Sequence, residues 1–414
     1  MGDTMSSSSV QTAPHIVQQR PKTGMGFAFD AVDFPVSANF AIFLDSVTQG
    51  GVYHDVERDW GDQVTEHMSP SLRKADMAAF RQTVQRAADK AFLTPLGRNL
   101  VLRAYHVLAA LMAGNRDFMA DLQGRNRFIF VVSAPRHGGS YLTKELLRAL
   151  GKDYRDYPAW FMHDGFPDIR QAWLSHDGME WLPMTRRAMQ QTAEWIVMAD
   201  WFFRDDPQRT DRDADAVDGV VDSPRPALRT IPKKATKAIY EARFFRDVFG
   251  MHAEYVVPVR HPAAACLSLV EKAGGMPENG LFPQYPRSAI EGWVLETWAQ
   301  EGVVAEAVAK MPYFTAYLHY WLRYHEIMAT NGLFLNNRKL TILPYTRTAF
   351  EGYLQRQHDR FRSGCRVEPM HIHSKVTAQY PQWLRQSEST LDYMESVWAS
   401  FGVRFPRAAV AEAL

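Results

Sequence analysis

A short apolar run, a glycine-containing loop and an amphipathic helix follow one another between residues 127 and 151. The run RFIFVV is rich in β-branched and aromatic residues and is short enough for a buried strand. In YLTKELLRALG, leucines recur at helical spacing and a glycine follows, which is typical of a helix and its end. The loop between them, SAPRHGGS, therefore joins the end of a strand to the beginning of a helix.

A loop in this position is suited to bind an anion. The first backbone N–H groups of a helix have no partner within the helix, and the helix dipole favours negative charge there. Glycines allow the backbone to approach a phosphate-like group closely, and arginine, histidine and serine side chains add donors. The residues that we expect to contact such a group are Pro135, Arg136, His137, Gly138, Gly139, Ser140 and Tyr141.

Further strands and helices alternate along the rest of the chain. AEYVVPV and KLTILPY are typical of strands, whereas KATKAIYEARFFRDVFG, RHPAAACLSLVEKAGG and LDYMESVWASFG are typical of helices. This alternation predicts an α/β fold with a parallel sheet flanked by helices. We expect a flexible tail over residues 1–24, a helical extension over 25–125 and the α/β domain over 126–414. Within that domain, residues 154–222 hold five tryptophans and predict a helical, aromatic cap insertion.

Composition limits the kinds of partner. The 414 residues include 47 Lys and Arg against 46 Asp and Glu, which gives a net charge of about +1. A protein that coats nucleic acid needs a large excess of basic residues, so we expect no nucleic-acid partner. Two cysteines are too few for a disulfide framework, and no apolar run is long enough for a transmembrane helix or a signal peptide. We therefore expect a cytoplasmic protein, and a homo-oligomer stays open.

A second candidate anion site follows the strand AEYVVPV. Arg260 comes at the end of the strand, and Ser268 lies eight residues later in RHPAAACLS. Pro262 is suited to the first turn of a helix. Since ligands of open α/β sheets bind at the carboxyl ends of the strands, Arg260 and Ser268 are expected to face one bound anion.

The two segments together resemble sulfotransferases that use 3′-phosphoadenosine 5′-phosphosulfate (PAPS). Family members carry a Pro-Lys/Arg-Ser-Gly-Thr-Thr-like loop after the first strand, and here Arg136 takes the basic position and Ser140 the last hydroxyl position. They also carry an arginine after a later strand with a serine eight residues beyond it. This chain has His137 for a usual serine, Gly139 for a usual threonine, and His261 for a frequent Asp or Asn.

The resemblance implies a fold like that of the P-loop nucleoside kinases and a role for each motif. The first loop would hold the 5′-phosphosulfate, and Arg260 with Ser268 would hold the 3′-phosphate. Many sulfotransferases have a catalytic Lys or His about 25 residues before the motif arginine, which favours Lys234, with Lys233 as the alternative. A histidine is suited to take the acceptor proton, and His163 in FMHDGF is our candidate. We expect a small-molecule, sugar or lipid acceptor with a hydroxyl or amine, and no metal.

Two other functions stay open at this point. An NTP-dependent, kinase-like enzyme would need a GxxxxGK[ST] loop, and no lysine follows Gly139. A non-catalytic member of the same fold would bind a nucleotide without transferring a group.

Overall fold

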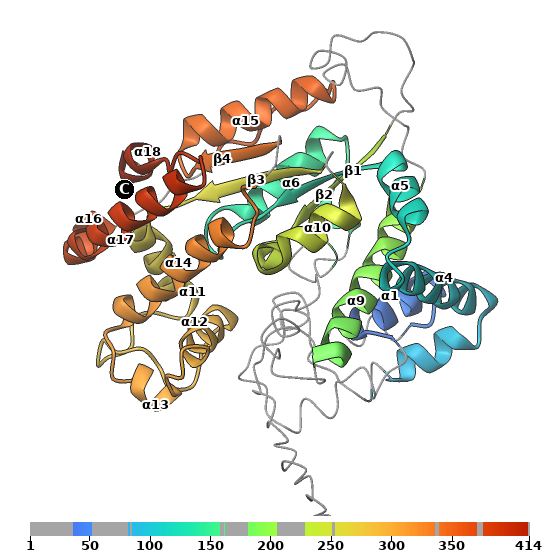
Figure 1. The fold of residues 1–414 in the computed structure, drawn as a ribbon, viewed down its shortest axis with the longest axis horizontal. Coiled ribbons are helices and arrows are strands. Elements are labelled where there is room, and N and C mark those ends of the chain that lie inside the picture. Colours follow the sequence, from blue (N-terminus) through green and yellow to red (C-terminus); the bar gives the residue numbers. More distant parts are fainter. Residues whose placement is uncertain are drawn as a thin grey trace, which may run out of the picture.

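We describe residues 36–51, 82, 85–157, 161, 181–204, 228–250, 253–335, 339–370 and 376–412 in the computed structural model of the chain. Within them, four strands form one sheet in the order β2-β1-β3-β4, and every pair is parallel (Figure 1). The strands are β1 (Asn126–Val131), β2 (Arg229–Lys234), β3 (Glu254–Val259) and β4 (Leu340–Pro344). The predicted α/β architecture with a parallel sheet is confirmed.

Alternate residues of the strands serve two separate apolar cores, because successive side chains of a strand point to opposite faces. In β1, Phe128 and Phe130 pack against Phe249, while Ile129 and Val131 belong to the core on the other face. All six residues of β1 are buried, as expected for a central strand covered on both sides.

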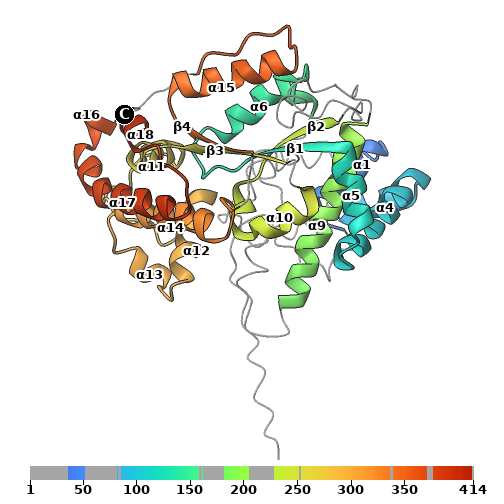
Figure 2. The same ribbon diagram turned by 45° about the horizontal axis from the view of Figure 1, so that its top comes forward.

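Helices cover both faces of the sheet (Figure 2). One face carries α6 (Gly139–Ala149) and α15 (Arg347–Arg360). The other face carries α10 (Ala242–Phe249), α11 (Pro262–Lys272), α14 (Tyr313–Thr330) and α17 (Pro381–Ser400). Shorter elements complete this side of the molecule: α12 (Ala289–Ala299), α13 (Ala305–Val308), α16 (Val376–Gln379), α18 (Arg407–Glu412) and a 3₁₀ helix at Thr236–Glu241. A further 3₁₀ helix at Tyr154–Asp156 contacts α6.

The described part of the N-terminal region is helical and shares the larger core with the sheet. It contains α1 (Ala38–Val47), α4 (Pro95–Met112) and α5 (Arg116–Arg125). The helix α9 (Trp181–Phe202), from the expected insertion, lies alongside α4 and α1 in both views (Figures 1 and 2). Trp195 of α9 is buried against Phe128, so this tryptophan is a core residue.

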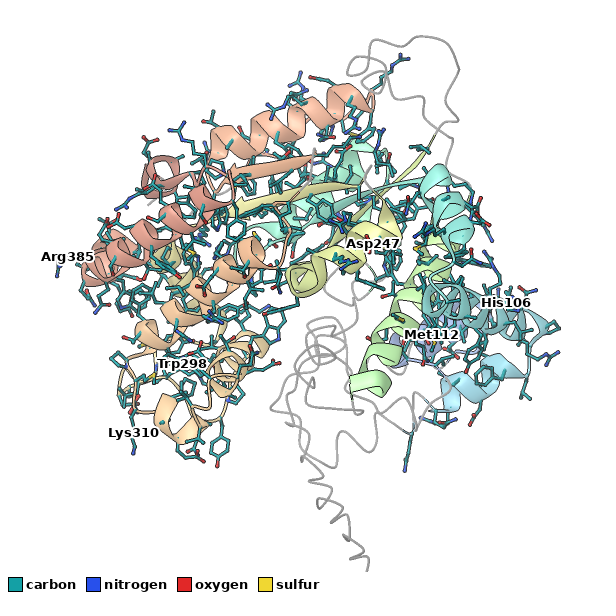
Figure 3. The ribbon with its side chains drawn as sticks, viewed as in Figure 1. His106, Met112, Asp247, Trp298, Lys310 and Arg385 are labelled. Atoms are coloured by element: carbon teal, nitrogen blue, oxygen red, sulfur yellow. The ribbon has the colours of Figure 1, made fainter. Side chains whose placement is uncertain are left out.

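The two ends of the molecule are well separated. Side chains fill the space between the sheet and its helices, and His106 and Met112 on α4 lie far from Trp298 on α12 and Arg385 on α17 (Figure 3). The candidate motifs lie between these ends, at the carboxyl edge of the sheet.

The strand β2 corrects one expectation. We expected residues 234–250 to form one helix, but Lys234 ends β2 and the α-helix begins only at Ala242. The segment RTIPKK has little strand character, and Pro232 cannot donate to a sheet. It is tolerated because, within the described residues, β2 pairs only with β1 and so forms an edge. Pairing with β1 therefore decides the structure of this segment, which its own sequence does not predict.

A buried carboxyl group joins α1 to α9. The backbone N–H of Ser37 donates to Glu194 Oε1 (2.9 Å), and Gln190 donates to the same oxygen (3.0 Å). The Ser37 hydroxyl accepts from the N–H of Phe40 and so caps α1. Burial raises the pKa of Glu194 to about 7, although these hydrogen bonds oppose the shift.

The pKa of Glu194 predicts a pH-dependent stability. The folded protein holds this proton more tightly than the unfolded chain, so the contribution is present at low pH and is lost as the pH rises from about 4.5 through about 7. At full extent this amounts to roughly 3 kcal/mol. We expect Glu194→Gln, which keeps the acceptor for Ser37, to remove this part of the pH dependence in denaturant titrations between pH 4.5 and 8. Equal pH profiles for both proteins would contradict the assignment.

Candidate functional site

The loops after β1 and β3 form the two sides of the site. These strands are neighbours in the sheet, but the helix after β1 (α6) packs on one face and the helix after β3 (α11) packs on the other. The chain thus leaves the carboxyl ends of adjacent strands in opposite directions. This is the arrangement in which open α/β sheets bind ligands.

Direct hydrogen bonds join the two predicted motifs. Arg260 Nη1 donates to the backbone oxygen of Arg136 (3.0 Å), and Arg136 Nε donates to Ser268 Oγ (3.0 Å). The pairs are separated by 124 and 132 residues in sequence. The structure therefore brings Arg136, Arg260 and Ser268 together at one place, as the sequence analysis expected of residues that face a common ligand.

The two guanidinium groups have no ion-pair partner among the described residues, and the Glu271 carboxylate acts on Arg260 only from beyond ion-pair distance. Arg260 is only 6% exposed, and within the described part of the chain no carboxylate forms an ion pair with Arg260 or Arg136. Burial lowers the pKa of Arg260, and the charge of Arg136 lowers it further, yet a guanidinium stays protonated in proteins. A buried charge without a partner is costly, so this place favours an anion.

Aromatic side chains border the arginines. The guanidinium carbon of Arg260 lies 4.5 Å from the centre of the Tyr345 ring, and Tyr345 follows directly after β4. On α14, Tyr317 is buried, and its hydroxyl has no hydrogen-bond partner among the described residues. Burial raises the pKa of Tyr317, whereas the charges of Arg260 and Arg136 lower it. This hydroxyl is thus a neutral donor close to the cationic pair.

The backbone of the first loop has the shape expected of an anion-binding turn. Gly138 has a left-handed φ of 82° and precedes α6, whose N-terminus has no side-chain cap. Arg136 is also left-handed (φ 69°), and the hydrogen bond from Arg260 holds its carbonyl. The first turn of α6, with exposed Ser140, is therefore open to a ligand such as a phosphate group.

Lys234 lies next to this loop, whereas Lys233 does not. A Cβ at Gly139 would lie 3.2 Å from Lys234 Cε, so the lysine reaches the loop. Lys233 points to the opposite face of β2, where it is buried, donates to the Phe161 carbonyl and lies over the rings of Phe161 and Trp195. Of the two lysines that the sequence left open, only Lys234 lies at the candidate site.

His137 does not fit the role of cationic donor that the sequence suggested. Its ring is fully buried, and burial lowers its pKa well below the ordinary value. The indole N–H of Trp321 can only donate, so His137 Nε2 accepts from it (3.1 Å), and Nδ1–H donates to the Pro135 carbonyl (2.9 Å). The imidazole is therefore neutral and faces the protein interior.

The second turn uses a histidine in place of the usual acidic residue or asparagine. His261 Nδ1 accepts from the backbone N–H of Ala263 (3.2 Å), which caps α11, and Pro262 occupies the first turn. Burial lowers the pKa of His261 to about 4, so the ring is neutral near pH 7. A neutral imidazole thus supplies the acceptor that caps this helix, a role for which Asp, Asn, Ser and Thr are the preferred residues.

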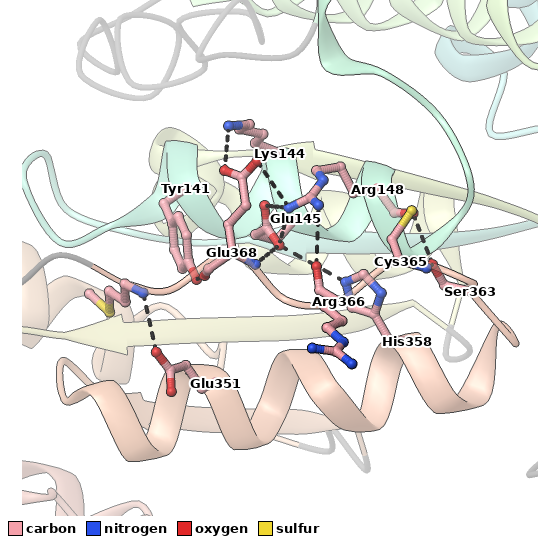
Figure 4. A network of polar contacts seen from close by, with 11 residues as sticks. Tyr141, Lys144, Glu145, Arg148, Glu351, His358, Ser363, Cys365, Arg366 and Glu368 are labelled. Carbon is pink, nitrogen blue, oxygen red and sulfur yellow. Dashed lines mark hydrogen bonds and ion pairs between the residues drawn. The ribbon is translucent and has the colours of Figure 1, made fainter.

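A polar network joins α6 to α15 and the segment that follows α15 (Figure 4). The Tyr141 hydroxyl donates to the Glu368 carbonyl (2.5 Å), and Lys144 and Arg148 pair with the Glu368 carboxylate. Arg148 also pairs with buried Glu145. The hydroxyl of Tyr141 is therefore engaged with the segment after α15, and only its ring or backbone could contribute to the site.

One predicted site residue, the candidate base His163, lies outside the described residues. Among the described residues, no three or more His, Cys, Asp or Glu side chains are grouped so that they could hold a metal ion. In the same ranges, no helix combines the length and apolar character needed to cross a membrane. The sequence analysis did not identify Trp321 or Tyr345 as residues of the site. For Tyr345, the one sequence signal was its position at the end of a predicted strand.

Comparisons of the chain with protein-family models, with curated proteins and with solved structures gave no match. The site is therefore interpreted from its own geometry and chemistry.

Two glycines with similar backbones allow a test of the loop. Gly138 (φ 82°) and Gly274 (φ 86°) both have left-handed conformations, which cost an alanine about 1–2 kcal/mol. A Cβ at Gly274 would meet nothing within 4 Å, whereas one at Gly138 would lie 2.9 Å from both Tyr345 and Phe350. We expect Gly138→Ala to lower the free energy of unfolding more than Gly274→Ala does in urea titrations. Equal losses would mean that the loop does not pack closely on these rings.

Arg260 and Arg360 form a matched pair for the charge argument. Arg360 binds Glu254 through two hydrogen bonds (2.8 and 3.0 Å), and these outweigh burial to lower the pKa of Glu254. Arg360→Met removes both hydrogen bonds and leaves the largely buried Glu254 carboxylate with the longer ion pair to Arg127 (3.6 Å), so it is expected to cost about 1–3 kcal/mol. Arg260→Met removes an uncompensated charge, so we expect a much smaller loss, or a gain, without ligand. A loss at Arg260 as large as that at Arg360, measured by urea unfolding, would contradict the absence of a counter-charge.

Proposed function

We propose that this protein is a PAPS-dependent sulfotransferase with an α/β fold like that of the P-loop nucleoside kinases. The observation that carries the proposal is that Arg136, Arg260 and Ser268 lie together at one place. Among the described residues, no carboxylate forms an ion pair with either arginine. A donor with two separate anionic groups suits a site made of an uncapped helix N-terminus on one side and a buried arginine on the other.

Each motif has a role in holding the donor. The first turn of α6, with Gly138, Gly139 and Ser140, would bind the 5′-phosphosulfate through backbone N–H groups and a hydroxyl. Arg260 and Ser268 would bind the 3′-phosphate. Without ligand, Arg136 donates to Ser268 (3.0 Å). We expect its guanidinium group to pair with the donor when the donor binds. Because the two anionic groups of the donor would face the buried charge of Arg260 and the partly exposed charge of Arg136, binding is expected to depend on both phosphates.

The reaction consists of one displacement at sulfur. The acceptor oxygen or nitrogen forms a bond to sulfur while the bond from sulfur to the 5′-phosphate oxygen breaks, which leaves 3′-phosphoadenosine 5′-phosphate and the sulfated acceptor. Negative charge then grows on the leaving phosphate, and a cation there stabilises the transition state. Lys234 is suited to this role because its side chain reaches Gly139 in the loop.

The acceptor loses one proton in this step, and a base must take it. His163 is proposed for this role on its sequence position alone. The proposed acceptor is a small molecule, sugar or lipid with a hydroxyl or amine, and the proposed setting is the cytoplasm, without nucleic acid as partner. The cations of the site would supply the charge stabilisation that a metal provides in other group-transfer enzymes.

Ligand binding and transfer test the proposal together. We expect 3′-phosphoadenosine 5′-phosphate to stabilise the protein in thermal unfolding by about 2.7 kcal/mol at a hundredfold excess over its dissociation constant, and AMP to stabilise it far less. With PAPS and a set of phenols, sugars and amines, we expect release of the bisphosphate and a sulfated product. Lys234→Met should keep binding of the bisphosphate but lower transfer by about a hundredfold or more.

The controls separate the competing functions. Lys310→Met changes an exposed lysine near α13 and should leave binding and transfer unchanged. Stabilisation by ATP with Mg²⁺ in preference to the bisphosphate would favour a kinase-like enzyme and overturn the proposal. Tight binding of the bisphosphate with no transfer to any acceptor would indicate a non-catalytic protein. Equal stabilisation by AMP would show that no 3′-phosphate site exists at Arg260.

A further inference from the structure

One indole N–H contacts both halves of the site. Trp321 Nε1 donates to His137 Nε2 in the first loop (3.1 Å) and to the backbone oxygen of Arg260 in the second turn (3.2 Å). Trp321 itself is fully buried in α14, which belongs to neither motif. A single donor from a third element thus fixes a side chain of one motif and the backbone of the other.

His137 is built to receive this donor. Its Nδ1–H donates to the Pro135 carbonyl, which leaves Nε2 as the acceptor. Rings of α14 enclose it: His325 lies 5.4 Å away between ring centres, and His325 in turn lies 4.0 Å from the Trp321 ring. A buried acceptor without a donor costs free energy. If the indole N–H is lost, the buried Nε2 of His137 therefore loses the donor that holds the ring in place. The substitution of histidine for a loop serine therefore gives this chain an attachment point for α14.

The same contact determines the position of the arginines. The carbonyl that Trp321 holds belongs to Arg260, whose guanidinium donates to the Arg136 carbonyl (3.0 Å), and Arg136 is followed by His137. These bonds form a closed ring from Trp321 through Arg260, Arg136 and His137 back to Trp321. A ring of this kind fixes the distance between the two motifs, because moving either motif breaks at least one of its bonds.

We infer that Trp321 is a positioning residue of the donor site, which acts through His137 to hold the two anion-binding motifs in register for one ligand. The inference rests on the proposed function for the identity of that ligand, but the ring of hydrogen bonds stands without it. Trp321 would not touch the donor. Its effect on binding would come from preorganising Arg136, Arg260 and Ser268 before the ligand arrives.

A second tryptophan provides the matched control. Trp398 of α17 is also fully buried, and its Nε1 donates to a backbone oxygen, that of His325 (3.1 Å), instead of to a residue of either motif. Trp321→Phe and Trp398→Phe each remove one buried N–H and keep a ring. We expect similar losses of stability without ligand. For Trp321→Phe alone, we expect the dissociation constant of 3′-phosphoadenosine 5′-phosphate, measured by calorimetry, to rise about tenfold.

Substitution at His137 provides the test by rescue. Glutamine can place an acceptor near the position of Nε2, whereas leucine cannot, so His137→Gln should retain more of the affinity than His137→Leu. Trp321→Phe combined with His137→Leu should weaken binding little beyond either single change, because both remove the same hydrogen bond. Full additivity of the two changes, or equal effects of Trp321→Phe and Trp398→Phe on affinity, would overturn the inference.

A measurement without ligand keeps the inference separate from the proposed function. In hydrogen exchange followed by mass spectrometry, Trp321→Phe should speed exchange in both residues 133–140 and residues 260–268, while Trp398→Phe should leave both unchanged relative to the rest of the chain. If the wild-type protein binds no bisphosphate but Trp321→Phe speeds exchange in both segments, the proposed function fails and the positioning role stands. If exchange changes in neither segment or in only one, Trp321 does not hold the two motifs together.

Discussion

The positive charge of Arg260 at the end of β3 is the constraint on which the site depends. The side chain is almost completely buried, and among the described residues no carboxylate forms an ion pair with it, although the charge of Glu271 acts on it from a greater distance. A protein keeps such a group at a cost in stability, because desolvation of a charge is repaid only by an opposite charge or by good hydrogen bonds. Here the hydrogen bond to the Arg136 carbonyl and the ring of Tyr345 provide part of that compensation, and a bound anion would provide the rest.

The topology of the sheet places a second cation beside the first. Because α6 and α11 leave β1 and β3 toward opposite faces, the two loops open at one edge without blocking each other. Arg136 and Ser268 then meet although 132 residues separate them. The end of β2 adds Lys234 at the same edge, and the end of β4 adds Tyr345, so all four strands contribute a residue to one region.

Local patterns predicted the strands and helices on either side of the two loops correctly, and β2 shows the limit of such patterns. The strands at 127–132 and 253–259 and the helix after each have strong apolar periodicity, and the structure confirms them within three residues. The segment RTIPKK has one strongly apolar residue, Ile231, and a proline, so it gives no strand signal. It becomes a strand because the edge of β1 offers hydrogen bonds to it. The strand conformation also decides which lysine reaches the loop. Neighbouring residues of a strand point to opposite faces, so Lys234 lies at the loop and Lys233 does not.

By itself, the sequence determined the α/β class and the positions of the two loops, because apolar spacing and turn residues are local properties. It also determined that cationic and small residues, which suit an anion site, follow two strands. Only the tertiary structure decided that His137 turns inward to Trp321, that Lys233 is buried beneath aromatic rings and that Arg260 lacks a described acidic partner. These outcomes depend on which side chains from distant parts of the chain come into contact. The packing of α14 and α9 on the sheet determines those contacts, and the residues adjacent in the chain do not.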